Sequence, residues 1–388
     1  MSITEILVPM QEVAWLPWAV QYFFYIGSAY AAAILFLVSL ILRDKTSHQL
    51  RSAFALCLGI CAVVGPLALT ADLHQPGRAW HFFAHLTSWS WMSRGALLLP
   101  LFSMLAVISA WLYLRPDIAQ LEKSDNKLVR LCSMLTLGRW QVPDRVTTSV
   151  VAVTVLSGLS IALYTGMEIA IVESRPMWHQ PASPIIWFVT AFFGAIGFTL
   201  FILSFLPNSE KTQTLSITDV SLLKRTVIIC SVLSLMLLPI WVSNGAYMDL
   251  LHYGQWFVNL LLMMGAFAVC LVMSFWLLRG TQFKRISLWV ASALTISTCW
   301  SIRWMTMIEV QTLPKFDVGP YPYDVPWGAP GILGVIGMAG LWLLMTMALT
   351  ELVPAKGEQV KLMAGSSIKS DSTKNSVRPS QQVRGHHG

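Results

Sequence analysis

The stretch Thr70–Phe83, TADLHQPGRAWHFF, lies at the end of an apolar run that is long enough to cross a membrane. A Pro-Gly pair within it predicts a turn, so we expect the helix to end near Leu73. Polar groups are costly at such a position, which makes this stretch a candidate for function. Its titratable and cationic side chains are Asp72, His74, Arg78 and His81.

The composition indicates that this helix is one of several membrane-spanning helices in the chain. Of the 388 residues, 55% are hydrophobic and 12% are charged, whereas soluble domains carry roughly twice that share of charge. Apolar runs of about 20 residues recur from one end of the chain to the other, as a bilayer requires. The sequence therefore predicts an all-α fold, a polytopic bundle of transmembrane helices.

The apolar runs predict about nine spans, at residues 17–42, 52–73, 91–114, 147–172, 183–206, 224–246, 255–279, 286–309 and 329–353. Residues 1–353 then form one transmembrane bundle. Residues 354–388 are rich in Ser, Lys and Gln and poor in aromatic residues, which predicts a disordered tail.

The distribution of Lys and Arg predicts the orientation of the bundle. If the N-terminus is outside, about 21 of the 26 basic residues fall in the inner loops and the tail. We therefore expect an outer N-terminus and a cytoplasmic C-terminus. The net charge of +7 arises from these alternating loops, so it does not indicate a nucleic-acid partner.

With this orientation, the polar side chains of the spans gather in the outer half of the membrane. They are Gln21, Asp72, His74, Tyr164, Glu168, Asn244, Arg303 and Glu309. Tyr164 and Glu168 are four residues apart and therefore share one helix face. Ion channels and transporters usually need polar groups near the midplane or along the whole path, whereas a one-sided set predicts a pocket at the outer side.

An apolar pocket with a few hydrogen-bonding and titratable groups suits a lipid-soluble quinone, whose oxidation releases protons that a carboxylate or a histidine can accept. Structural alternatives exist for most of the set, such as a tyrosine of the interfacial aromatic belt, a glutamine that caps a helix, or an ion pair made by Arg303 or Glu309. Glu168 is the hardest to explain in this way, because it lies about one turn inside the membrane edge.

The histidines and cysteines predict that this chain holds no haem and no iron–sulfur cluster. None of the 8 histidines lies in the middle of a predicted span, where a haem ligand is expected. The 6 cysteines form no CxxC pair and no cluster with histidine. A chain that oxidises a quinol without a redox centre of its own needs a redox partner, which we expect on the outer face.

Several stretches resemble the NrfD/PsrC family of integral membrane subunits, and within it the membrane subunits of tetrathionate reductases. They are WLPWAVQYFF (Trp15–Phe24), PLALTADLHQ (Pro66–Gln75), WHFF followed by WSWM (Trp80–Met92), GALLLPLF (Gly95–Phe102), YTGMEIAIVESRPMW (Tyr164–Trp178) and RWMTMIEVQTLPKF (Arg303–Phe316). They are spread over most of the chain.

The resemblance implies a quinone pocket near the periplasmic side of the bacterial cytoplasmic (inner) membrane. It implies haem-free oxidation of quinol, with menaquinol as the expected donor. It also implies a ferredoxin-like 4Fe-4S subunit that takes the electrons and a molybdopterin catalytic subunit that receives them.

Residue by residue, Asp72 and Arg78 fall on the D-L-x-x-P-x-R pattern of the family, and Tyr164 falls on its Y-T-G segment, which resembles a quinone contact. Gln21 occupies the polar position of the first span. The common family form has Gly-Arg where this chain has His74–Gln75, so His74 is expected to take over a proton-relay role.

The main hypothesis is a quinol-oxidising membrane anchor of a periplasm-facing respiratory reductase. The expected quinone-binding residues are Gln21, His74, Arg78, Tyr164 and Arg303, and the expected proton-handling residues are Asp72, His74 and Glu168. Two alternatives remain open. One is a secondary transporter or proton-conducting membrane protein, and the other is a purely structural anchor with quinone oxidised elsewhere.

Overall fold

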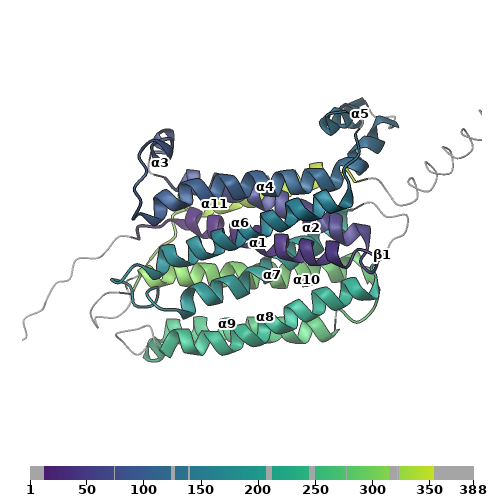
Figure 1. Ribbon diagram of the computed structural model, residues 1–388. Helices are drawn as coiled ribbons and strands as arrows, with labels where there is room; N and C mark the ends of the chain where they lie inside the picture. Colours follow the sequence, from purple (N-terminus) through teal and green to yellow (C-terminus); the bar gives the residue numbers. More distant parts are fainter. Residues whose placement is uncertain are drawn as a thin grey trace, which may run out of the picture.

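The computed structural model describes residues 13–73, 75–123, 127–138, 140–206, 212–243, 250–276, 278–313, 321 and 323–353 (Figure 1). Over these residues, nine long helices run side by side along one axis. They are α1 (Pro17–Ile41), α2 (His48–Asp72), α4 (Trp91–Gln120), α6 (Asp144–Ala170), α7 (Ala182–Phe205), α8 (Ile217–Ser243), α9 (Gly254–Trp276), α10 (Arg285–Trp304) and α11 (Ile332–Thr350). The predicted tail, residues 354–388, lies outside the described residues.

Short elements lie between the long helices. The helical ones are η1 (Pro76–Arg78), α3 (His81–Ala84), η2 (Leu121–Lys123), α5 (Lys127–Cys132), η3 (Ser133–Thr136), η4 (Leu250–His252) and the π-helical turn η5 (Met305–Glu309). Strands β1 (Thr212–Thr214) and β2 (Gln282–Lys284) pair antiparallel, with Gln213 opposite Phe283. This ribbon joins the segments that precede α8 and α10.

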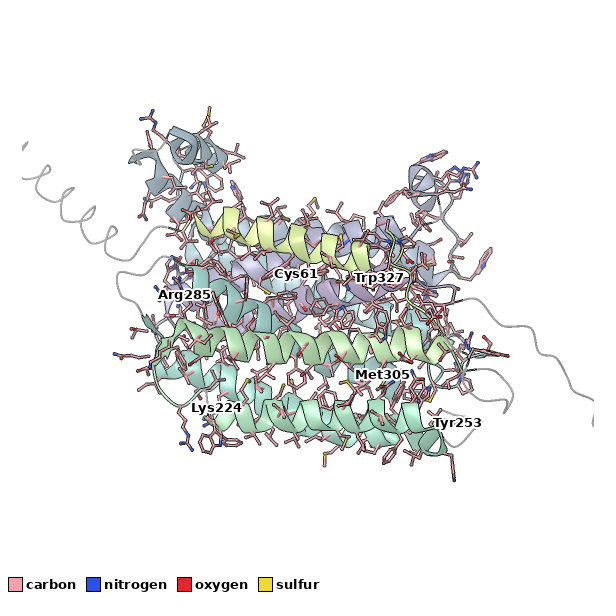
Figure 2. All side chains as sticks on the ribbon, turned by 180° about the vertical axis from the view of Figure 1, so that it is seen from behind. Cys61, Lys224, Tyr253, Arg285, Met305 and Trp327 are labelled. Carbon is pink, nitrogen blue, oxygen red and sulfur yellow. The ribbon has the colours of Figure 1, made fainter. Side chains whose placement is uncertain are left out.

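Eight of the long helices are long and apolar enough to cross a membrane, which confirms the prediction of an all-α polytopic bundle. The chain is a multi-pass integral membrane protein. The remaining long helix, α10, is more polar, but it runs the length of the bundle from Arg285 towards Met305 (Figure 2). It packs against α7, and α10 with η5 covers the predicted span at residues 286–309, although α10 is not among the eight helices that are apolar enough to count as spans.

Because the helices alternate in direction, the bundle has two distinct ends, named here after the first and last residues of α1. The Pro17 end holds the last residues of α2, α6, α8 and α10, and the Ile41 end holds their first residues. In Figure 2, Tyr253, Met305 and Trp327 mark the Pro17 end, whereas Lys224 and Arg285 mark the Ile41 end.

Three helices form the centre of the bundle. About four fifths of the apolar segments of α1 and α7 are buried (78% each) and 67% of that of α2, against 22% for α11 and 28% for α6. Small residues allow these central helices to approach closely. A Cβ atom on Gly194 of α7 would lie 2.2 Å from Ser28 Oγ of α1, and one on Gly65 of α2 would lie 3.2 Å from Ile26 N.

Two short helical segments project from the ends of α4. Figure 1 shows α3 beyond the first residues of α4 and α5 beyond its last residues, on the same side of the bundle. The α3 segment and the turn after it expose large apolar side chains, including Trp80, Phe83 and Trp89. At the other end, Arg115 holds the chain after α5, because its guanidinium donates to the carbonyls of Thr136, Gly138 and Trp140.

Candidate functional site

A cavity of about 240 Å³ lies at the Pro17 end, between α2, α4, α6 and the η1–α3 segment. Its lining is largely apolar and comprises Pro66, Leu69, Thr70, Leu73, Ala79, Phe82, Phe83, Met92, Gly95, Ala96, Leu99, Pro100, Ser103 and Tyr164. Three hydroxyl groups, of Thr70, Ser103 and Tyr164, are the polar side-chain groups of this lining. Such a cavity suits a flat apolar ring that carries a few polar atoms.

Tyr164 connects this cavity to the protein core. Its side chain is 3% exposed, and its ring lies against Gly95 of α4. A Cβ atom on Gly95 would lie 2.1 Å from Tyr164 Cζ, so the ring can occupy this place only because residue 95 has no side chain. The Tyr164 hydroxyl makes a weak contact with Met92 Sδ at 3.9 Å and keeps its capacity to donate a stronger hydrogen bond.

Two further buried polar groups adjoin Tyr164. Tyr22 of α1 and Glu168 of α6 are both close enough to the Tyr164 hydroxyl for electrostatic interaction. Among the described residues, however, the Tyr22 hydroxyl and both Glu168 carboxylate oxygens have no hydrogen-bond partner of normal geometry. A carboxyl group buried without such a partner is costly within a membrane. The two phenols and the carboxyl group therefore form a polar cluster, named here the Tyr22–Tyr164–Glu168 cluster.

The structure places the other predicted residues of this end at different depths. Gln21 of α1 is 2% exposed, and its Nε2 has no hydrogen-bond partner among the described residues. Asp72 is half-buried as the last residue of α2, which also contributes Leu69 to the cavity. Arg78 is exposed in η1. His74 lies outside the described residues, so its predicted role stays a prediction.

Arg303 lies apart from the cavity lining, in the centre of the bundle. Its side chain is 1% exposed and donates to Thr190 Oγ1 at 3.0 Å and to the Trp187 carbonyl at 2.5 Å. Its guanidinium also lies 4.9 Å from the centre of the Trp187 ring. Glu309 instead accepts from Trp304 Nε1 at 3.2 Å. These contacts favour a packing role for Arg303, which binds α10 to α7.

A second polar cluster lies at the Ile41 end, where the sequence analysis expected no comparable set. His48 of α2 contacts Tyr113 Oη at 2.8 Å and Asp117 Oδ2 at 2.9 Å, both on α4. Arg51 donates to the same Tyr113 hydroxyl at 3.0 Å. Asp117 is 3% exposed, so this is a buried network that joins two helices. Sequence reasoning missed it because the span on α4 was expected to end at residue 114.

Tyr22 was also missed, although it lies in the first quoted resemblance stretch, next to Gln21. Tyrosine is common among the lipid-facing and interfacial residues of membrane proteins, so its type alone carried no signal. A helical-wheel argument within α1 could not identify it either, because every residue from Ala19 to Ala33 is buried. Only its position beside Tyr164 and Glu168 distinguishes it.

Comparison with known proteins relates this bundle to a family. Residues 8–315 match the family described as "Polysulphide reductase, NrfD". The chain is 33% identical over 358 residues to a tetrathionate reductase subunit of Salmonella typhimurium, an alignment that covers 90% of this chain and 95% of that protein. It is 22% identical over 375 residues to a selenate reductase subunit of Mesobacillus selenatarsenatis, with 89% and 87% covered. The matched segment contains the cavity and every long helix from α1 to α10, and the chain therefore belongs to the NrfD family.

Proposed function

We propose that this chain is the quinol-oxidising membrane subunit of a periplasm-facing respiratory reductase, which passes electrons from menaquinol to an iron–sulfur partner. Family membership and the similarity to subunits of two reductases are consistent with a membrane anchor of a reductase. The observation that carries the proposal is the Tyr22–Tyr164–Glu168 cluster beside an apolar cavity at one end of the bundle.

The residues at the cavity fit a quinone head group. The ring needs an apolar space, which α2, α4 and α6 supply, and its oxygen atoms need donors and acceptors, which the cluster supplies. A bound quinol supplies two electrons and two protons when it is oxidised. In our proposal Tyr164 orients the ring oxygen that faces α6, and the buried Glu168 carboxyl group accepts one proton there. Asp72 conducts the second proton to water, and both electrons pass to the iron–sulfur partner.

Protons then leave towards the Pro17 end. Asp72 is half-buried at the end of α2, close to the surface, which suits a group that exchanges protons with water. Gln21 and His74 remain proposed contacts of the head group, and Arg78 a proposed contact of the head group or of the partner subunit. Tyr22 joins this set, since its buried hydroxyl adjoins that of Tyr164.

The proposed orientation puts the Pro17 end in the periplasm. The Ile41 end carries basic residues that precede helices or lie in their first turns, which is the pattern of a cytoplasmic side. Examples are Arg43, Lys45, Arg145 and Arg285. A 4Fe-4S subunit docked at the Pro17 end would lie near the cavity, and a molybdopterin subunit would follow it. The exposed aromatic side chains of the α3 segment suit such a contact.

One observation favours a second candidate, a proton-conducting protein. The His48–Asp117 pair and its neighbours place titratable groups at the Ile41 end as well as at the Pro17 end. Proton uptake at the Ile41 end, measured in proteoliposomes without any quinol, would support this candidate over the first.

The test of the proposal compares two electron donors in the assembled complex. Glu168→Gln should lower the quinol-driven rate about 100-fold, because it removes a proton acceptor, and Tyr164→Phe should lower it about tenfold, because it removes a hydrogen-bond donor. Both variants should keep the rate with a dye that reduces the partner directly. Tyr25→Phe is the matched control, since Tyr25 is a buried tyrosine of α1 that stacks on Phe198. An unchanged quinol-driven rate in Glu168→Gln would contradict the proposal.

A further inference from the structure

A second cavity, of about 290 Å³, lies at the Pro17 end on another side of the bundle, between α9 and α10. Its lining consists of Asn259, Leu262, Met263, Ala266, Ser297, Thr298, Trp300, Ser301, Trp304, Met305 and Glu309. None of these residues lines the cavity beside Tyr164. In Figure 2, Met305 and Tyr253 mark this end of α10 and the start of α9.

The π-helical turn η5 shapes this second cavity. In an α-helix, residue i+5 points about 140° away from residue i, but the wider turn of a π-helix, whose hydrogen bonds join residues i and i+5, brings the two closer to one face. Trp304 and Glu309 are five apart, and Trp304 Nε1 donates to Glu309 Oε1 at 3.2 Å across this turn. The rare turn thus brings a carboxylate beside an indole. Trp300 stacks on Trp304 at 5.1 Å, which extends the aromatic wall.

The polar groups of the cavity suit a cation. Glu309 is the charged side chain among the described lining residues, and Arg303 points away from it to α7. A carboxylate beside a pair of stacked tryptophans suits an ammonium group, because the carboxylate supplies the opposite charge and the rings supply an aromatic wall. Asn259 and Ser301 add an amide and a hydroxyl, which can donate to an anionic neighbour of that ammonium group.

The cavity is reached from the lipid. Leu262, which lines it, is 66% exposed, and the neighbouring Phe257, Val258 and Leu261 of α9 are exposed too. In a membrane protein such a face contacts acyl chains. Glu309 and Asn259 lie near the ends of their helices, at the depth of lipid head groups. The occupant therefore has apolar chains, a protonated amine and an anionic group beside it.

We propose that the α9–α10 cavity binds the head group of an amine-bearing phospholipid, of the phosphatidylethanolamine type. Glu309 holds the ammonium group, the Trp300–Trp304 pair covers it, and the amide and hydroxyl groups hold the phosphate. This site is independent of quinol oxidation, because its lining is separate from that of the quinone cavity.

The test is a lipid titration of the purified full chain with its co-purifying subunits, read by native mass spectrometry. The probes are palmitoyl-oleoyl phosphatidylethanolamine and its N-acetylated form, which has no charged amine. The wild-type protein should bind the amine form about tenfold more tightly, since a charge-assisted hydrogen bond is lost on acetylation. Glu309→Gln should remove this preference, whereas Glu351→Gln, an exposed glutamate at the C-cap of α11, should keep it.

Trp304→Phe provides a second variant if Glu309→Gln does not fold. It keeps an aromatic ring but removes the N–H group that holds the carboxylate, and it should weaken the preference severalfold. Equal binding of both lipids by the wild-type protein, or an unchanged preference in both variants, would overturn the proposal. So would a loss of bound quinone in Glu309→Gln, because the cavity would then be a second quinone site.

Discussion

Replacing Gly95 by alanine should uncouple the protein from its quinol while leaving the bundle folded. The new Cβ atom would lie 2.1 Å from Cζ, 2.3 Å from Oη and 2.5 Å from Cε2 of Tyr164. To restore an ordinary contact of 3.4 Å, the ring must shift by about 1.3 Å. Tyr164 lines the cavity, so open space adjoins its side chain.

We expect this shift to change the position of the Tyr164 hydroxyl relative to Glu168 and to the space proposed for the head group. A displacement of about 1 Å in a positioned group can cost about 100-fold in rate. Overpacking a buried site typically costs about 1–3 kcal/mol of stability, which a bundle of this size tolerates. We therefore expect Gly95→Ala to lower the quinol-driven rate about 100-fold and to change the dye-driven rate less than twofold.

The assay measures both rates on the purified complex, together with its thermal unfolding. Gly265→Ala is the matched control, because a Cβ atom on Gly265 of α9 meets no other atom within 4 Å. It should match the wild-type protein in both rates. A wild-type quinol-driven rate in Gly95→Ala would refute the placement of the head group beside Tyr164. Equal loss of both rates would show that the change acts on assembly instead.

Three further outcomes are expected. Arg303→Lys should lower the stability of the complex by about 2 kcal/mol, because lysine cannot donate to both acceptors on α7. Thermal unfolding measures this loss, and a lower quinol-driven rate at unchanged stability would instead support the predicted quinone contact of Arg303. Asp117→Asn should lower the stability by about 1–2 kcal/mol, because its partner histidine loses a charged acceptor; thermal unfolding of the complex checks this, and an unchanged midpoint would show that the pair contributes nothing. Trp89 and Asp144 are exposed at opposite ends of the bundle. A membrane-impermeant maleimide added to intact spheroplasts should therefore label Trp89→Cys but not Asp144→Cys. The reverse labelling pattern would contradict the proposed orientation.

The fold could be predicted from the sequence because the length and apolar composition of each span identify it as a transmembrane helix. The boundaries were less accessible. The span on α4 was expected to end at residue 114, yet α4 continues through Pro116 to Gln120. In the same way α2 begins at His48 rather than at residue 52, since Ser47 caps it by accepting from the Leu50 N–H group at 3.1 Å. These extra turns carry the His48–Asp117 pair.

The candidate site could be predicted from the sequence only in part, because its residues come from several helices. The spacing of Tyr164 and Glu168 predicts a common helix face, and the structure brings both to one polar cluster. Tyr22 and Gly95 lie on other helices, so their contribution depends on tertiary packing that no spacing rule expresses. For Arg303, a charged residue in a span suggested a ligand site, and the spacing gave no sign that its guanidinium donates to α7; its quinone contact stays a prediction.

The central position of α1 sets a problem for the synthesis of this protein. α1 emerges first, but its partner α7 begins only at Ala182, about 140 residues after α1 ends at Ile41. At about 5–20 residues per second, translation of that interval takes about 7 to 28 s. During this time Tyr22, Gln21 and Ser28 face an incomplete bundle, although all three are buried in the finished one. The central helix α1 must therefore remain in the membrane without its partner α7, next to α2 alone at first, until α7 is synthesised and packs against it.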